Sequence, residues 1–321
     1  MESNSIITNS VYEGKNRKKP IKRMKPLKCY NKGEPLTKVE PTVAPTITST
    51  IVKSSATILK GDCLAHMKSL PDKSVDLIIC DLPFGCLATT PIKKPMPRSD
   101  NPAIMRNDNT NIKGCSWDIK IDLEVFWREV KRIRKSDHTP CIHFCTTKYG
   151  IDLINSNPKE FRYDLVWDKQ RGVSFLSVNK MPMRSHEMIY IFSKAGANYN
   201  RIDYKGDFKG WKAKEDTNKK SIVYSSGMPN GWKNKGNDGT KRCVLSVIQH
   251  STSHTRGGHP TTKPIDLYKW LIERYSKEGE TVLDPTAGSF NSGLASVQLN
   301  RRYIGIEKDT VFFNKGISKF V

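Results

Sequence analysis

An acid, a proline and an aromatic residue follow one another at the end of a short apolar run, and together they could bind a planar amine. The run spans residues 75–80 and is followed by Asp81, Leu82, Pro83 and Phe84. Asp81 and a backbone carbonyl can accept both hydrogens of an exocyclic amino group, while the Phe84 ring can stack on the heterocycle that carries it. Pro83 fixes its own φ and biases Leu82 toward an extended backbone, which holds the turn in one shape. These residues alone leave a second interpretation open, in which Asp81 caps a turn and Phe84 belongs to the core.

A second group of residues, near the end of the chain, could bind a nucleoside. A predicted strand at 281–283 leads into a turn of small residues, 284–293, and then into a helix. The next predicted strand, 303–306, ends at Glu307, which can accept hydrogen bonds from both ribose hydroxyls, and Gly288 lets the backbone approach the ligand. The turn has neither a GxGxxG pattern nor a Walker lysine, so a dinucleotide or a triphosphate fits poorly. The sequence therefore predicts a nucleoside cofactor without a pyrophosphate, and S-adenosylmethionine belongs to that class.

Short β-prone runs alternate with helical patterns around both groups, which predicts an α/β fold with a parallel sheet. In such a sheet ligands bind beyond the carboxyl ends of the strands, and Asp81 is expected there. A helix that starts near Asp122 has its apolar residues at helical spacing, so its aromatic side chains are assigned to the core. The other predicted elements are strands at 57–60, 140–145, 163–167 and 186–193, and helices at 64–70, 149–155 and 264–275.

The composition divides the chain into four parts. Residues 1–54 form a basic tail that is expected to be disordered, either a phosphate-tracking arm or a solvated leader. Residues 55–195 would form one half of the main domain and 259–321 the other, with the polar segment 86–116 as a mobile loop over the site. Between the halves, 196–258 interleaves aromatic and basic residues, which favours nucleic-acid recognition over an irregular surface insertion.

The charge of the chain indicates a polyanionic partner. The 321 residues include 54 lysines and arginines against 32 acids, a formal net charge of +22 with a pI of about 9.6. Such an excess favours nucleic acid through phosphate contacts, although charge alone does not separate an enzyme from a passive binder. The hydrophobic content is 36%, without an apolar run long enough for a membrane span or a signal core, so a cytoplasmic protein is expected.

The cysteines and histidines show no spacing that is typical of a metal site. None of the 8 cysteines stands in a Cys-x-x-Cys pair, and Cys141 and Cys145 lie within an apolar run. Free buried thiols are therefore expected rather than zinc or disulfides. The histidines match no metal or triad spacing, and His186 and His259 are interpreted as structural.

Taken in order, the motifs resemble those of the beta-class amino-DNA methyltransferases, and most closely the phage-type adenine-N6 DNA methyltransferases. In that class the motif for the target base precedes the cofactor motif, as residues 81–84 precede 284–293 here. The resemblance implies a Rossmann-like S-adenosylmethionine-dependent methyltransferase fold with circularly permuted motif order and an inserted target-recognition region. It runs from about residue 57 to 316 and is also carried by Gly61-Asp62-Cys63, Leu70-Pro71-Asp72, Ser74-Val75-Asp76, Ser116-Trp117-Asp118, Trp167-Asp168-Lys169, Lys180-Met181-Pro182-Met183-Arg184, His186-Glu187, His259-Pro260-Thr261-Thr262-Lys263-Pro264 and Ile304-Gly305-Ile306-Glu307.

The resemblance implies a site-specific enzyme that moves a methyl group from S-adenosylmethionine to N6 of a flipped adenine. Asp81 and the Leu82 carbonyl would accept the N6 hydrogens, with Pro83 and Phe84 completing the catalytic motif. Double-stranded DNA is the implied partner, homodimers are common among relatives, and a phage-encoded protein would act in the host cytoplasm. The implied cofactor residues are Asp62, Cys63, Lys263, Asp284, Thr286, Gly288, Ser289 and Glu307.

The chain departs from the usual pattern at three places. The catalytic motif has Leu82 where proline is commoner and Phe84 where tyrosine is commoner, yet the carbonyl and the stacking face survive both changes. Phe290 stands in the cofactor turn where glycine is usual, so its ring must find room. Residues 86–114 form an insertion, because relatives often reach the Trp-Asp pair sooner.

Other functions remain open on the residues alone. Cytosine-N4 methylation uses the same pocket, commonly with serine in place of Asp81, and transfer to a protein glutamine typically carries asparagine there. A DNA-binding protein that has kept the fold without activity is the alternative from a different class.

Overall fold

The structure is a computed structural model that describes residues 48–53, 55–85, 118–173, 175–210, 238–252 and 262–320. The expected loop 86–116 and the first 47 residues of the expected tail lie outside the described residues. The contacts of the chain separate residues 1–44 from 45–321, and every described residue belongs to the second unit. In the described part, no helix is both long and apolar enough to span a membrane.

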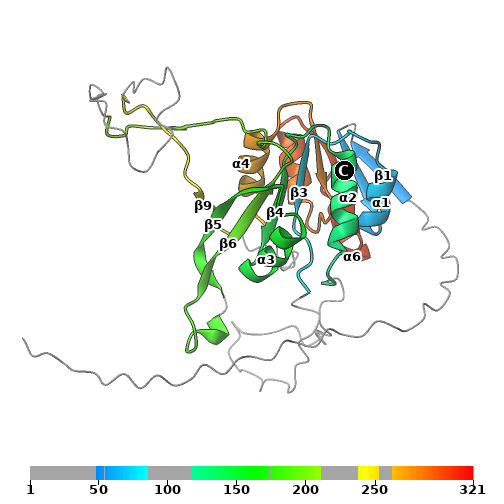
Figure 1. Cartoon of the computed structure of the whole chain (residues 1–321), viewed down its shortest axis with the longest axis horizontal. Coiled ribbons are helices and arrows are strands. Elements are labelled where there is room, and N and C mark those ends of the chain that lie inside the picture. The colour runs from blue at the N-terminus through cyan, green and yellow to red at the C-terminus, as the bar shows by residue number, and fades with distance from the viewer. Residues whose placement is uncertain are drawn as a thin grey trace, which may run out of the picture. The chain divides into compact units, whose positions relative to one another are not determined.

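Within the described residues, nine strands form one sheet in the order β1-β2-β11-β10-β3-β4-β6-β5-β9 (Figure 1). The five neighbours from β2 to β4 run parallel, whereas β6 is antiparallel to both β4 and β5. At the two edges, β1 pairs antiparallel with β2 and β9 pairs parallel with β5. The strands are β1 (Thr48–Lys53), β2 (Ala56–Lys60), β3 (Leu77–Cys80), β4 (Cys141–Cys145), β5 (Phe161–Val173), β6 (Arg184–Phe192), β9 (Val247–Gln249), β10 (Thr281–Asp284) and β11 (Arg302–Glu307), and a separate pair is formed by β7 (Tyr204–Lys205) and β8 (Lys241–Arg242).

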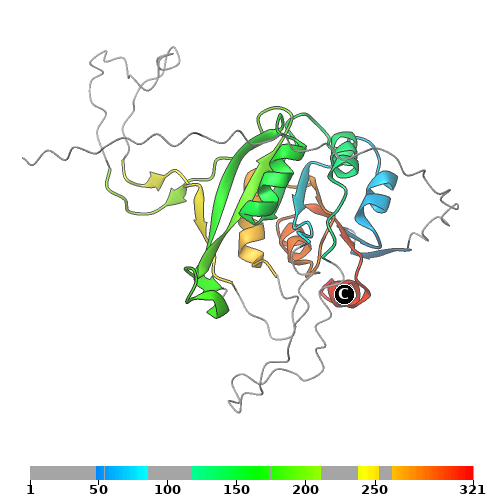
Figure 2. The ribbon, with the colours of Figure 1, turned by 60° about the horizontal axis from the view of Figure 1, so that its bottom comes forward.

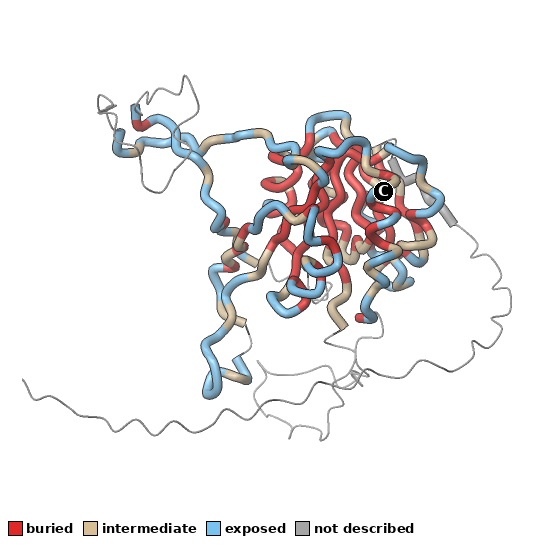
Figure 3. The backbone as a smooth tube through the Cα atoms, viewed as in Figure 1, coloured by how far each residue is buried: buried red, intermediate tan, exposed pale blue. Residues whose placement is uncertain are grey.

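Helices cover both faces of the sheet, which explains why its central strands are apolar throughout. All four residues of β3 are buried; Leu77 and Ile79 belong to one apolar cluster, and Ile78 and Cys80 belong to the other. The first cluster takes in side chains of α4, α5 and α6, and the second those of α1, α2 and α3. Figure 2 shows these two sets of helices on opposite faces of the sheet. The buried residues accordingly concentrate along the central strands in Figure 3. The helices are α1 (Cys63–Ser69), α2 (Leu123–Ile133), α3 (Thr147–Ser156), α4 (Ile265–Tyr275), α5 (Asn291–Gln298) and α6 (Thr310–Ile317).

Helix α2 shows how closely the local sequence determines an element. Its N-cap is Asp122, whose Oδ1 accepts hydrogen bonds from the backbone N–H groups of Glu124 and Val125. Such a cap typically stabilises a helix by about 1 kcal/mol relative to alanine. The apolar face buries Phe126 and Ile133, as the helical spacing predicts.

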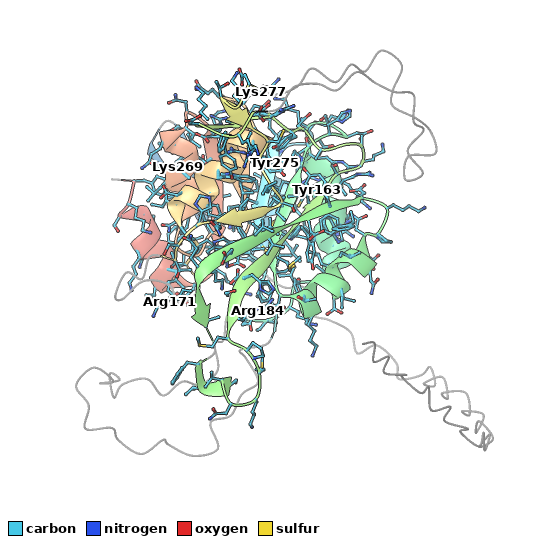
Figure 4. All side chains as sticks on the ribbon, turned by 90° about the vertical axis from the view of Figure 1, so that its left-hand side faces the viewer. Tyr163, Arg171, Arg184, Lys269, Tyr275 and Lys277 are labelled. Atoms are coloured by element: carbon cyan, nitrogen blue, oxygen red, sulfur yellow. The ribbon has the colours of Figure 1, made fainter. Side chains whose placement is uncertain are left out.

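Two expectations about the architecture need correction. The expected tail does not extend to residue 54, because Thr48–Lys53 already forms strand β1 against β2. Strand β5 runs past the predicted 163–167, and its Tyr163 hydroxyl lies 3.0 Å from that of Tyr275 on α4 (Figure 4).

The segment predicted to recognise DNA is partly built into this sheet. Of residues 196–258 the structure describes 196–210 and 238–252, and within them β9 extends the sheet beside β5. The side chain of Ile248 in β9 is buried in the main core. Recognition of DNA by this segment stays a prediction.

Candidate active site

A cavity of about 610 Å³ lies where the strands β2, β11, β10 and β3 end. Its wall contains the residue that follows each of these strands or ends it, as the rule for open parallel sheets predicts. The volume is in the range of small-molecule sites. The predicted residues that line it are Asp62, Cys63, Asp81, Leu82, Pro83, Phe84, Lys263, Thr286, Gly288, Ser289 and Glu307.

At one end of the cavity a lysine is shared by two carboxylates. The Lys263 Nζ lies 2.6 Å from Oδ2 of Asp81 and 3.5 Å from Oε2 of Glu187 on β6. Lys169, on β5, pairs with the other oxygen of Glu187. The resemblance implied that Lys263 contacts the cofactor, and the structure shows that its ammonium group pairs with Asp81.

Burial and charge shift the two carboxyl groups in opposite directions. Burial raises the pKa of Asp81, and the positive charge of Lys263 offsets this only in part. Burial would also raise the pKa of Glu187, but the charges of Lys263 and Lys169 outweigh it and lower that pKa. For Lys263 burial acts to lower the pKa, and the two carboxylates reverse the effect and raise it. Lys263 therefore stays protonated, and Asp81 is the carboxyl group that takes up a proton first.

The aspartate turn is tied to the cofactor turn that follows β10. The backbone N–H of Asp81 donates to Oγ1 of Thr286 at 3.2 Å, and the side chain of Asn291 donates to the Lys263 carbonyl at 2.8 Å. Because β10 and β3 are also paired in the sheet, the two turns form one rigid wall.

Glu307 ends β11 with its carboxylate oriented by the backbone. Oε2 accepts from the Gly288 N–H at 2.8 Å, and Oε1 accepts from the Asp309 N–H at 2.7 Å. Burial raises the pKa of this carboxyl, while these donors oppose the rise. Each carboxylate oxygen has a second lone pair, so Glu307 can accept ribose hydroxyls in addition.

Asp284 lies beneath the turn and is absent from the residues that line the cavity. Its carboxylate accepts from the Thr286 N–H at 3.0 Å and from the Ser292 hydroxyl. Burial raises the pKa of Asp284 to about 7. Asp284 thus shapes the turn after β10, and the direct cofactor contact that the resemblance implied stays a prediction.

The side chain of Phe290 lies in the hydrophobic core. It is the N-cap of α5 with φ of 57°, in the left-handed region that glycine adopts without strain, which explains why glycine is usual there. Its ring is fully buried, packs against Phe320 with ring centroids 6.4 Å apart, and lies outside the cavity lining. A Cβ on Gly316 of α6 would overlap this ring. The absence of a side chain at Gly316 therefore provides the space for the Phe290 ring.

Several residues of this site were not singled out from the sequence. Glu187 was quoted only as part of a motif, and the ring of Tyr149, 5.1 Å from that of Phe84, was assigned only to a helix. Gly85 donates its N–H to Oδ1 of Asp118 at 2.9 Å, which joins the two sides of the 86–117 segment. These contacts depend on strand order and register, which no single motif encodes.

On strands β3 and β4, three buried side chains that could ligate a metal come together. Sγ of Cys80, Sγ of Cys141 and a ring nitrogen of His143 all lie within 4.8 Å of one another. Cys141 and the imidazole are hydrogen-bonded at 3.2 Å. Burial acts to raise the pKa of Cys141, but the hydrogen bond with Cys80 and the charge and hydrogen bond of His143 outweigh it and lower that pKa to about 6. Sequence spacing could not reveal this group because its members come from neighbouring strands, and the expectation of no metal stays untested.

The chain belongs to the DNA methylase family, whose sequence pattern matches residues 75–318. Its cofactor is accordingly S-adenosylmethionine. The family contains enzymes that act on N6 of adenine and on N4 of cytosine.

The relatives are DNA methyltransferases. The chain is 43% identical over 311 residues to the type II methyltransferase M.HindIII of Haemophilus influenzae, covering 82% of this chain and 94% of the relative. It is 28% identical over 266 residues to the DNA adenine methyltransferase YhdJ of Escherichia coli K12, covering 82% of each. Among solved structures, the cytosine-N4-specific PvuII DNA methyltransferase matches 84% of this chain and 87% of its own, with a TM-score of 0.54 and 16% identity. That likeness confirms the predicted methyltransferase fold.

Proposed function

We propose that the protein transfers a methyl group from S-adenosylmethionine to N6 of an adenine flipped out of double-stranded DNA. The observation that carries the proposal is that Asp81 and Glu307 face one cavity, from the ends of two strands separated only by β10. A base at Asp81 and a nucleoside cofactor at Glu307 would thus meet inside one site. The similarity to a relative named as a DNA adenine methyltransferase supports adenine, as does the aspartate at position 81.

The residues around the cavity fit the cofactor. Glu307 is held for the ribose by two backbone donors, and Gly288, with φ of 49°, brings the backbone to the cavity without a side chain. Asp62 caps α1 with Oδ1, and Cys63 follows it on the wall, where the adenine edge would lie. When bound, S-adenosylmethionine supplies an electrophilic methyl group on a positively charged sulfur.

The chain itself would activate and hold the target nitrogen. Asp81 and the Leu82 carbonyl accept the two N6 hydrogens, so that the nitrogen lone pair is localised and points at the methyl group. A carboxylate can accept from the base and from Lys263 together, and Lys263 fixes its orientation. As the new N–C bond would form and the methyl–sulfur bond would break, with its electron pair staying on the sulfur, positive charge would grow on N6, and Asp81 stabilises it. The raised pKa of Asp81 also suits it to accept the proton that N6 then loses.

The proposal is tested by identifying the methylated nucleoside. Purified protein is incubated with unmethylated genomic DNA and S-adenosylmethionine, the DNA is digested, and the nucleosides are identified by mass spectrometry. N6-methyladenine is expected, and sequencing of the product then locates the methylated sites. N4-methylcytosine would overturn the base assignment but keep the site.

Two variants separate binding from chemistry. Asp81→Ala should abolish methylation while calorimetry still detects the cofactor, and Glu307→Ala should weaken cofactor binding. Methylation by Asp81→Ala at the wild-type rate would contradict the mechanism.

A further inference from the structure

The strands β5 and β6 continue past the sheet as a hairpin that carries exposed apolar side chains. The pairing extends to Val173 opposite Arg184, and a 3₁₀ turn at Phe175–Ser177 follows. We call residues 175–183 the hairpin tip. In the tip Phe175 is 72% exposed and Leu176 80%, the highest values among the large apolar side chains of the described residues. Figure 3 shows this end of the hairpin in the colour of exposed residues, away from the core.

The charges around the hairpin tip have one sign. From residue 171 to 186 the sequence contains Arg171, Lys180 and Arg184 and no acid. Arg171 and Lys180 are exposed. Figure 4 shows Arg171 and Arg184 on the two strands where the hairpin leaves the sheet. Exposed apolar side chains framed by cations fit a duplex, in which phosphates surround a stack of apolar base faces.

The hairpin is directly connected to the catalytic carboxylate. Arg184 and Glu187 lie on the same strand, so their Cα atoms are about 10 Å apart at 3.3 Å per residue. Glu187 contacts Lys263, which holds Asp81, and its other partner Lys169 lies on the opposite strand of the hairpin. A duplex bound by the hairpin would therefore be positioned relative to Asp81 by strands β5 and β6 and by the contacts of Glu187 and Lys263.

We propose that the hairpin tip inserts Phe175 and Leu176 into the duplex beside the target base and so supports the flipped state. This inference rests on the proposed function and adds a positioning role to it. The inserted side chains take up the stacking that the flipped base leaves, while Arg171, Lys180 and Arg184 bind the neighbouring phosphates. The exposed apolar surface is then covered only when DNA is bound.

The test compares two synthetic duplexes that carry the methylated sequence found above. One has the target base normally paired, and the other has an abasic site opposite it, which removes most of the cost of flipping. Phe175→Ala combined with Leu176→Ala should lower kcat/KM on the paired duplex on the order of tenfold or more, as expected for lost stacking on a base. On the abasic duplex the same protein should approach the wild-type rate.

Controls separate this role from a general loss of structure. Leu176→Met keeps the apolar volume and should keep the wild-type rate on both duplexes. The double alanine variant and Leu176→Met should both keep the wild-type melting temperature and cofactor affinity, because the changed side chains are exposed. An equal loss on both duplexes, or no loss, would overturn the inference. A difference in oligomeric state between the wild type and the double alanine variant, measured by light scattering, would also overturn the inference. The tip would then be a contact between copies of this chain. If the wild type methylates neither duplex, the proposed function fails, and the inference fails with it.

Discussion

Lys263 and Asp81 lie far apart in the sequence, yet their side chains meet at 2.6 Å inside the cavity. The side chain of Lys263 is only 5% exposed and that of Asp81 20%. A second carboxylate, Glu187, shares the same cation. The pair therefore sets both the charge and the direction of the group that is proposed to receive the target base.

Replacing Lys263 with methionine should impair catalysis more than cofactor binding. The change leaves two carboxylates close together without their shared cation, which raises the pKa of Asp81 further and frees its rotamer. We expect kcat to fall by about a hundredfold, the size of effect seen when one preorganised electrostatic group is removed. Lys194→Met removes an exposed lysine that forms an ion pair with exposed Asp137, and should leave kcat unchanged. Equal effects of the two changes would argue against the assigned role.

The stability of the fold should depend on the protonation of Asp284. The pKa of Asp284 is about 7 in the folded protein and near 3.8 in the unfolded chain. The folded protein therefore favours the neutral form of this carboxyl group. This contribution is fully present below about pH 4 and is lost as the pH rises through about 7. Asp284→Asn should flatten that part of the pH dependence, which amounts to a few kcal/mol at about 1.4 kcal/mol per pKa unit. Urea unfolding from pH 5 to 8 measures this, and an unchanged slope would contradict the burial of a neutral carboxyl.

Glu307→Gln should weaken the binding of S-adenosylmethionine. The amide keeps one acceptor oxygen but replaces the other with a donor, which then faces the N–H of Gly288 or of Asp309. A loss of about ten- to a hundredfold in affinity is expected for one charged hydrogen-bonding group. Isothermal calorimetry measures it, and Glu124→Gln, on the exposed start of α2, serves as the matched control.

Phe290 and Gly316 should show strong coupling in a double-mutant cycle. Phe290→Ala removes a fully buried ring and should cost about 3–5 kcal/mol in the free energy of unfolding. Gly316→Ala adds a Cβ that overlaps this ring, so it should destabilise although alanine normally favours a helix by about 1 kcal/mol. In the double variant the ring is gone and the added methyl group should be tolerated. Strictly additive effects in urea unfolding would show that the ring does not occupy this space.

The sequence predicted the parts of the site that depend on local order. The strand that leads into Asp81, the helix that starts near Asp122 and the strand that leads to Glu307 each follow from a short pattern, and the structure contains all three. Glu187 could not be assigned a contact in the same way, because its approach to Lys263 requires β6 to lie antiparallel beside β4. The place of β9 beside β5 and the overlap of Phe290 with Gly316 were inaccessible for the same reason, since both depend on tertiary packing.

The hydrogen bond from Gly85 to Asp118 joins the two ends of the segment between them at the rim of the cavity. Closing a longer loop costs little additional entropy, since the cost grows only with the logarithm of length. Insertions or deletions in the sequence between Gly85 and Asp118 should therefore cost little free energy of folding, because strand β3 before Asp81 and the helix that begins after Asp122 keep their positions.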